Sequence, residues 1–146
     1  MTARSPYGGG TFIADTSAWA RSGRPRIAPR WSAALRNGQI ATCPIVNLEL
    51  LYSAPNGDSL DSLGADLAQL CDVPIRRAVT KAALGAQRAL AHVHPLFHRS
   101  VTLPDLLIAA AAAEAGVGVL HYDADYDTLA TVLDFESRWI APRGSL

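Results

Sequence analysis

The sequence has little of several features that would assign a function directly. It carries no excess charge, because 13 Lys and Arg residues balance 13 Asp and Glu residues, which argues against a basic nucleic-acid coat protein. Its longest apolar run, 106–113, is too short to cross a bilayer. Its two cysteines, Cys43 and Cys71, form no CxxC motif. We therefore expect both thiols to be buried apolar groups rather than metal ligands or a redox pair.

The beginning of the sequence also lacks a recognisable targeting or phosphate-binding motif. Glycines at 8–10 interrupt any run that could serve as a secretory signal, so we expect a soluble cytoplasmic protein without a membrane segment. The same glycines precede the first predicted strand instead of following it, which is the wrong place for a phosphate loop. No GxSxG nucleophile motif is present.

What the sequence does contain is the composition of a folded domain. Apolar residues make up 49% of the chain and charged residues 18%, which is typical of globular proteins. A length of 146 residues fits one domain with a substantial core. We expect residues 1–10 to form a flexible N-terminus and residues 11–146 to form a single domain.

Strand-like and helix-like segments alternate along the chain, which predicts an α/β fold with a mainly parallel sheet covered on both faces. Strands are predicted at 11–14, 39–43, 72–75, 118–122 and 138–141. Helices are predicted at 16–21, 29–37, 44–53, 59–70, 78–93, 103–115 and 125–133. In such sheets ligands bind at the carboxyl ends of the strands, near a reversal of strand order.

Acidic residues stand at positions that this fold would bring together. Asp15 and Asp123 each follow a predicted strand, so both should lie at the same edge of the sheet. Asp15 is also a plausible helix N-cap. Asp105 belongs to the sequence Thr102-Leu103-Pro104-Asp105, which matches a capping box. A capping role and a ligand role are compatible, because a helix N-terminus stabilises a carboxylate.

Glu49 is the acid with the least obvious structural purpose. Its predicted helix is apolar, and Glu49 shares a face with Ile45 and Tyr52. No Lys or Arg lies within one helical turn of it in the sequence. A partly buried carboxylate without a partner is unfavourable. Glu49 therefore either reaches solvent or faces a cation.

The segment that contains Asp123, Asp125 and Asp127 is rich in acids but does not fit an EF-hand loop. Thr128 occupies the position that requires glycine, and Asp134 stands where the loop requires Glu. If the acids of the four segments converge, their mutual repulsion requires protons or a cation. A cluster of oxygen ligands without Cys or His suits Mg²⁺ or Mn²⁺. Such an ion can activate water for phosphodiester hydrolysis.

Four segments, taken in order, resemble PIN-domain proteins, and more narrowly the VapC-type toxins of bacterial toxin–antitoxin pairs. The resemblance extends from about residue 11 to about residue 142. It implies a three-layer α/β/α sandwich, a PIN-like nuclease domain over residues 11–146, and a magnesium-dependent endoribonuclease that cuts RNA. It also implies a cognate antitoxin of the VapB type and a homodimer. The segments are Ile13–Trp19, Glu49–Leu51, Pro104–Ala110 and His121–Asp127.

The resemblance also assigns individual residues. The acidic quartet of the family would be Asp15, Glu49, Asp105 and Asp123, which would bind the metal and act in catalysis. The hydroxyl beside the first acid would be Thr16 or Ser17, and further acids of the last loop would be Asp125 and Asp127. Many relatives have Thr-Asn before the fourth acid, whereas this chain has His121-Tyr122, so the lining of the site should differ there.

Other functions remain open at this point. The chain could be a catalytically weak module that binds RNA or a protein partner, or a nuclease for another substrate class. Arg99 lies six residues before Asp105 and could reach the substrate. Four arginines that follow Asp15 closely could bind RNA phosphates or an antitoxin, or form a solvated loop; they are Arg21, Arg24, Arg26 and Arg30.

Overall fold

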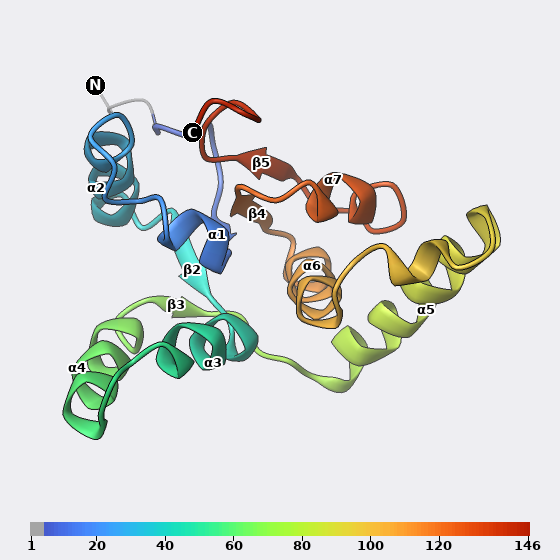
Figure 1. Ribbon diagram of the computed structural model, residues 1–146, viewed down its shortest axis with the longest axis horizontal. Coiled ribbons are helices and arrows are strands. Elements are labelled where there is room, and N and C mark those ends of the chain that lie inside the picture. Colours follow the sequence, from blue (N-terminus) through green and yellow to red (C-terminus); the bar gives the residue numbers. More distant parts are fainter. Residues whose placement is uncertain (1–4) are drawn as a thin grey trace.

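The computed structural model describes residues 5–146, and its centre is a parallel five-stranded sheet (Figure 1). The strand order is β3-β2-β1-β4-β5. The strands are β1 (Phe12–Ala14), β2 (Ile40–Thr42), β3 (Cys71–Asp72), β4 (Gly118–His121) and β5 (Ser137–Trp139). The helices are α1 (Thr16–Trp19), α2 (Ala28–Arg36), α3 (Pro44–Tyr52), α4 (Gly57–Leu67), α5 (Arg77–Val93), α6 (Leu103–Ala115) and α7 (Asp125–Leu129), with a 3₁₀ turn, η1 (Phe97–Arg99), before α6.

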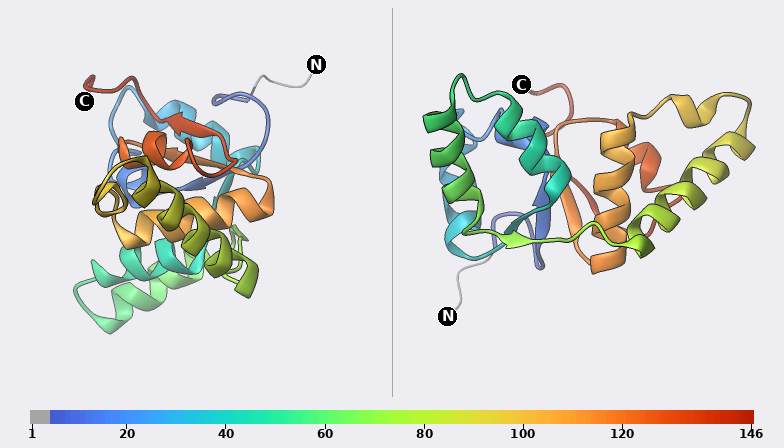
Figure 2. Two further views of the ribbon diagram at one scale, coloured as in Figure 1. Left: turned by 90° about the vertical axis from the view of Figure 1, so that its right-hand side faces the viewer. Right: turned by 90° about the horizontal axis from the view of Figure 1, so that it is seen from below.

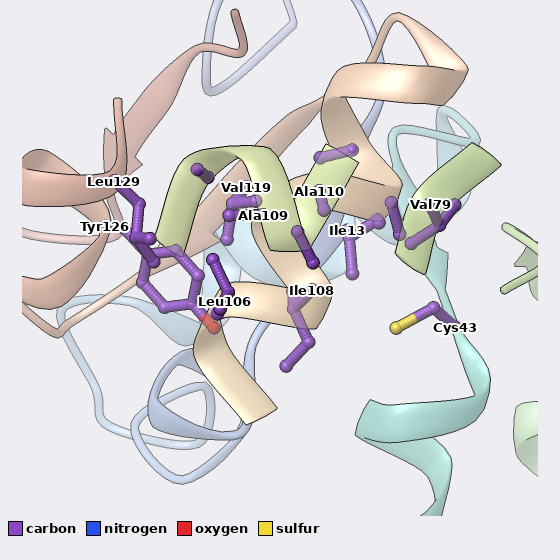
Figure 3. Close-up of a cluster of buried hydrophobic side chains, with 14 of the residues drawn as sticks. Ile13, Cys43, Val79, Leu106, Ile108, Ala109, Ala110, Val119, Tyr126 and Leu129 are labelled. Atoms are coloured by element: carbon purple, nitrogen blue, oxygen red, sulfur yellow. The ribbon is translucent and has the colours of Figure 1, made fainter. Parts of the chain in front are cut away.

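Two separate cores lie on the two faces of the sheet, because successive strand residues point to opposite sides. Ile13 and Val119 face a core built with α3, α5, α6 and α7, part of which Figure 3 shows. Phe12 and Leu120 face a second core, which contains Trp31 of α2. The chain is thus a three-layer α/β/α sandwich, and the predicted fold class is confirmed.

The order of the strands reverses beside β1, which is flanked by β2 on one side and β4 on the other. All three strands are parallel, so their carboxyl ends meet at one edge of the sheet. Asp15 follows β1 directly, and Asp123 stands two residues beyond β4. The topology therefore places a potential ligand site at the position expected for an open α/β sheet.

Helix α6 brings a third acidic segment to the same edge. Thr102 caps its N-terminus, Pro104 occupies its first turn, and Gly116 ends it with a φ of 69°. Five small or apolar residues from Ile108 to Ala112 are fully buried, because α6 lies between the sheet and α5 (Figure 2). Its N-terminal turn, which carries Asp105, is therefore held firmly in place.

Residues 5–10, part of the predicted flexible N-terminus, pack against the domain. Tyr7 is buried in the second core. The Arg30 guanidinium donates to the Pro6 carbonyl at 2.7 Å, and the Gln39 amide donates to the Gly8 carbonyl at 2.8 Å. Burial of an aromatic ring explains why a segment rich in glycine is fixed here. Residues 1–4 lie outside the described residues.

The boundaries of some elements differ from the predictions. The third strand was predicted at 72–75 but covers Cys71–Asp72, because Pro74 has no N–H group to continue the ladder. Cys71 is exposed on this edge strand, so its predicted burial is wrong, whereas Cys43 is buried as expected. The last helix ends at Leu129 instead of 133, and the last strand begins at Ser137. No helix of residues 5–146 has the length and apolar character needed to cross a membrane.

Candidate metal centre

Asp15 is buried, and each of its carboxylate oxygens has a defined partner. Oδ2 accepts hydrogen bonds from the Ser17 amide at 3.0 Å and from Ser17 Oγ at 2.5 Å. Oδ1 accepts from the Tyr126 hydroxyl at 2.8 Å. The side chain therefore caps α1, as one of the sequence-based alternatives predicted, and still points one oxygen toward the other acids.

Ser17 connects the two central strands at the site. Its Oγ donates to Asp15 and accepts from the backbone N–H of Tyr122 at 2.9 Å. The chain after β4 is thus fixed relative to the chain after β1. Of the two hydroxyl residues proposed beside the first acid, Ser17 is the one whose hydroxyl binds the Asp15 carboxylate. Within the described residues, the Thr16 side chain makes no hydrogen bond.

Asp105 lies in the first turn of α6, and both sequence-based interpretations of it are compatible with the geometry. Its backbone N–H donates to Thr102 Oγ1 at 3.3 Å, as in a capping box. Its side chain is 7% exposed and lies 3.0 Å from the Tyr126 hydroxyl. Burial, followed by the negative charge of Asp15, raises the pKa of Asp105 to about 8. Without a cation, Asp105 is therefore protonated at neutral pH.

Tyr126 joins Asp15 to Asp105 through one hydroxyl group. That hydroxyl has a single proton, which it cannot give fully to both carboxylates. The hydroxyl lies within donating distance of Asp15 Oδ1 at 2.8 Å and of Asp105 Oδ1 at 3.0 Å, so the two carboxylates share one donor. Sequence analysis did not single out Tyr126. Its ring lies in the core beside Leu129, as an ordinary buried tyrosine of a helix would (Figure 3).

Asp123 and Asp125 complete a group of three carboxylates with Asp105. One oxygen from each lies within 4.8 Å of the others, which is close enough to share an ion. Asp123 Oδ1 also accepts from the Asp125 amide at 2.9 Å, and Asp125 Oδ2 accepts from the Thr102 amide at 3.3 Å. The acid-rich loop therefore faces the N-terminus of α6.

Asp127, which the sequence suggested as a further ligand, is occupied elsewhere. Its Oδ1 accepts from Ser137 Oγ at 2.7 Å, and its Oδ2 accepts from the Trp139 indole at 3.0 Å. Both oxygens thus bind α7 to β5. Asp127 therefore stabilises the packing of α7 against β5 and is not part of the carboxylate cluster.

His121, at the position where we expected the lining of the site to differ, is fully buried behind the loop. Its Nδ1 accepts from the Asp123 amide at 3.1 Å, which leaves Nε2 as the donor to Ser137 Oγ at 2.7 Å. Burial lowers the pKa of His121 to about 4, so the ring is neutral at physiological pH. A neutral imidazole therefore orients the backbone of Asp123 and takes no part in the charge of the cluster.

Glu49 approaches the cluster from α3. Burial raises the pKa of Glu49, and the charge of Asp15 raises it further. Its Oε1 is buried and has no hydrogen-bond partner within the described residues. An unpaired buried carboxylate oxygen costs about 1–3 kcal/mol. A cation would supply the missing partner, as the sequence-based argument for Glu49 required.

The arginines considered as RNA contacts do not behave as one group. Arg24, Arg26 and Arg99 are exposed, and Arg30 is bound to the N-terminal segment. Arg21 alone is attached to the site, since its Nη1 donates to the Ser17 carbonyl at 3.0 Å.

Four aspartates thus lie at the site, and Glu49 is close enough for the charge of Asp15 to raise its pKa. The aspartates are Asp15, Asp105, Asp123 and Asp125. The site offers only oxygen ligands, which suit a hard divalent cation. Two observations fit such an ion: the unpaired oxygen of Glu49 and the strongly raised pKa of Asp105. The Glu49 oxygen lacks a partner, and the Asp105 pKa is raised mainly by burial and further by the charge of Asp15, so a cation would stabilise both carboxylates.

Comparison with known proteins gives a consistent result. A family model described as the PIN domain matches residues 12–132. Ribonuclease VapC18 of Mycobacterium tuberculosis is 46% identical over 135 residues, with 92% of this chain and 98% of the relative covered. Ribonuclease VapC51 of the same organism is 36% identical over 135 residues and covers 92% of this chain and 96% of the relative.

Solved structures agree at the level of fold. A DNA-bound VapBC from Salmonella typhimurium matches with a TM-score of 0.69 at 16% identity, covering 91% of this chain and 100% of that one. VapBC2 from Rickettsia felis, bound to a promoter DNA fragment, matches with a TM-score of 0.66 at 16% identity, covering 87% and 98%.

Proposed function

The chain belongs to the PIN-domain family, and on that premise we propose that it is a divalent-metal-dependent endoribonuclease acting as the toxin of a toxin–antitoxin pair. The observation that carries the proposal is the convergence of Asp105, Asp123 and Asp125 at the reversal point of the sheet. Asp15 is joined to this group through the Tyr126 hydroxyl, and Glu49 lies close enough for the charge of Asp15 to raise its pKa. The relatives named ribonucleases cover nearly the whole chain, so the activity is proposed for the whole domain.

Mg²⁺, or Mn²⁺ in its place, is the ion that the ligand set favours. Asp15, Asp105, Asp123 and Glu49 would hold it, with Asp125 as a further candidate. When bound, such an ion lowers the pKa of a water molecule and neutralises charge on a phosphate group. Within the described residues, the Ser17 hydroxyl is bonded to Asp15 and to the Tyr122 amide, and both ring nitrogens of His121 are also bonded. Neither side chain is free to act as a nucleophile, which favours direct attack by water.

The residues of the chain have distinct tasks in this proposal. Ser17 keeps Asp15 in one orientation through two hydrogen bonds. The Tyr126 hydroxyl separates Asp15 from Asp105 and can hold a proton between them while no cation is present. The neutral His121 fixes the loop of Asp123 from behind. Each contact limits the movement of a ligand, which preserves the geometry that a divalent ion requires.

We also propose the partners that the relatives suggest. The antitoxin would be of the VapB type, because the two solved structures described above are VapBC complexes. We expect the chain to act in the cytoplasm, where RNA is accessible, and to form a homodimer. Size-exclusion chromatography with light scattering tests the dimer, and co-purification with the product of a neighbouring small open reading frame tests the antitoxin.

The experiment that tests the function compares RNA cleavage by the purified protein with and without Mg²⁺. Cleavage should require Mg²⁺, stop with EDTA, and fall at least about 100-fold in Asp15→Asn, because even residues that only support metal ligands contribute 10–100-fold. Asp58→Asn is the matched control, since Asp58 is an exposed acid on α4. Equal cleavage in EDTA would reject the proposal. RNA binding without turnover at any Mg²⁺ concentration would favour a binding module instead.

A further inference from the structure

Arg21 lies at the edge of the metal centre between two residues that are part of its framework. Its Nη1 donates to the carbonyl of Ser17, the residue whose hydroxyl binds Asp15. Its guanidinium carbon lies 4.4 Å from the centre of the Tyr122 ring, and Tyr122 directly precedes Asp123. The Arg21 guanidinium is therefore held by residues that are close in sequence to Asp15 and Asp123.

The guanidinium is held in a fixed orientation but is not saturated with partners. Stacking on the Tyr122 ring fixes its plane, and the bond to Ser17 fixes its rotation. The Tyr122 ring is itself held, since its hydroxyl accepts from the Leu146 amide at 3.0 Å. Only one of the five N–H groups of Arg21 has a protein acceptor, and Nε is buried without any within the described residues.

The charge of Arg21 is also unpaired. Among residues 5–146 the single ion pair joins Arg138 to Glu136. Arg21 therefore forms no ion pair with an acid of the cluster, although it contacts Ser17, two positions after Asp15, and Tyr122, directly before Asp123. A planar guanidinium with free N–H groups matches the geometry of a phosphate group better than any other side chain.

We propose that Arg21 is a substrate-binding residue, which contacts a phosphate of the RNA backbone while the acidic cluster holds the reacting one. This inference rests on the proposed ribonuclease function and adds the residue that positions the substrate. It also separates Arg21 from the neighbouring Arg24, whose exposed side chain makes no hydrogen bond, ion pair or cation–π contact within residues 5–146.

The test measures RNA binding as a function of salt. A labelled single-stranded RNA is titrated by fluorescence anisotropy at several KCl concentrations, with Asp105→Asn present in every protein to prevent cleavage. Arg21→Ala should weaken binding about tenfold and reduce the slope of log K against log salt by about 0.7, the value for one phosphate contact on a single strand. Arg24→Ala is the matched control and should leave the slope unchanged. Arg21→Lys should keep the slope but bind about threefold more weakly, because the planar fork is lost.

A second measurement distinguishes substrate binding from support of Ser17. With Asp105 intact, Arg21→Ala should raise KM about tenfold, keep kcat within about twofold, and bind Mn²⁺ as tightly as the parent protein. An unchanged salt slope combined with weaker Mn²⁺ binding and a lower kcat would overturn the proposal, because Arg21 would then act only through Ser17 and Asp15. If Arg21→Ala does not fold, Arg21→Lys decides, and RNA affinity equal to the parent's would overturn the proposal. Absence of RNA cleavage by the unmodified chain would instead contradict the proposed function itself.

Discussion

Binding of Mg²⁺ at pH 6–7 should release a proton from Asp105. Burial and the neighbouring Asp15 charge raise the pKa of Asp105 to about 8, and a metal ligand must be deprotonated. At pH 6 only about 1% of the metal-free protein would have Asp105 ionised, and at pH 8 about half would, so apparent Mg²⁺ affinity should rise about 50-fold between pH 6 and pH 8 and level off above about pH 9. The raised pKa of Glu49 acts in the same direction.

Isothermal titration calorimetry measures both parts of this prediction. Titrations of Mg²⁺ at pH 6, 7 and 8 give the affinities, and buffers of different ionisation enthalpy give the number of protons released. Asp105→Asn should bind more weakly and lose most of the pH dependence. Asp58→Asn, which removes an exposed acid on α4, should behave like the parent protein. An affinity that changes less than about twofold between pH 6 and pH 8 would refute the reasoning.

The same protonation should appear in the stability of the metal-free protein. Between pH 4 and pH 8 the folded chain keeps the Asp105 proton that the unfolded chain releases, so the free energy of unfolding should fall as pH rises. His121 acts oppositely below pH 6.5, because its pKa of about 4 means that only the unfolded chain takes up the proton. Urea unfolding without metal should therefore give lower stability at pH 8 than at pH 6.5, and equal or higher stability at pH 8 would count against the shift.

Three substitutions test single contacts. Tyr126→Phe removes the hydroxyl between two acids and should lower the free energy of unfolding by about 2 kcal/mol without metal, and by less with Mg²⁺. Equal losses in both conditions would show that the hydroxyl does not reduce the repulsion between Asp15 and Asp105. Glu49→Gln should abolish RNA cleavage yet raise the free energy of unfolding without metal by about 1 kcal/mol. A less stable variant would contradict the conclusion that the Glu49 carboxylate has an unpaired buried oxygen. Gly118→Ala should cost about 1–3 kcal/mol in urea unfolding because its Cβ would lie 2.6 Å from the Phe12 ring, whereas Gly85→Ala on α5 has open space and should be neutral or stabilising.

The sequence predicted the layers and the acids that meet at one edge of the sheet because these depend on local patterns. Asp15 follows a buried strand, Asp105 stands at the third position of a capped helix, and Glu49 interrupts an apolar helix. Such features are visible within a few residues of the chain. The edge strand β3 was misplaced because it is short and exposed, so its pairing depends on Thr42 of the neighbouring strand more than on its own residues.

The contacts between distant segments were not predictable in the same way. Tyr126 meets Asp15 across 111 positions of sequence, and Ser17 meets Tyr122 across 105. No local pattern distinguishes a core tyrosine from one whose hydroxyl bridges two carboxylates. The sequence also could not show that Asp125 joins the cluster whereas Asp127 does not. That difference depends on the hydrogen bonds that Ser137 and Trp139 of β5 donate to the Asp127 carboxylate.

The most direct test of the central claim is the anomalous scattering of Mn²⁺ in crystals of the protein. A peak should lie within about 2.0–2.6 Å of carboxylate oxygens from Asp105 and Asp123, with Asp15, Asp125 or Glu49 completing the ligands directly or through water. The peak should be absent in Asp105→Asn crystals grown with the same ion. A peak at any other group of acids, or none at this edge of the sheet at saturating Mn²⁺, would contradict the assignment of a metal-dependent site.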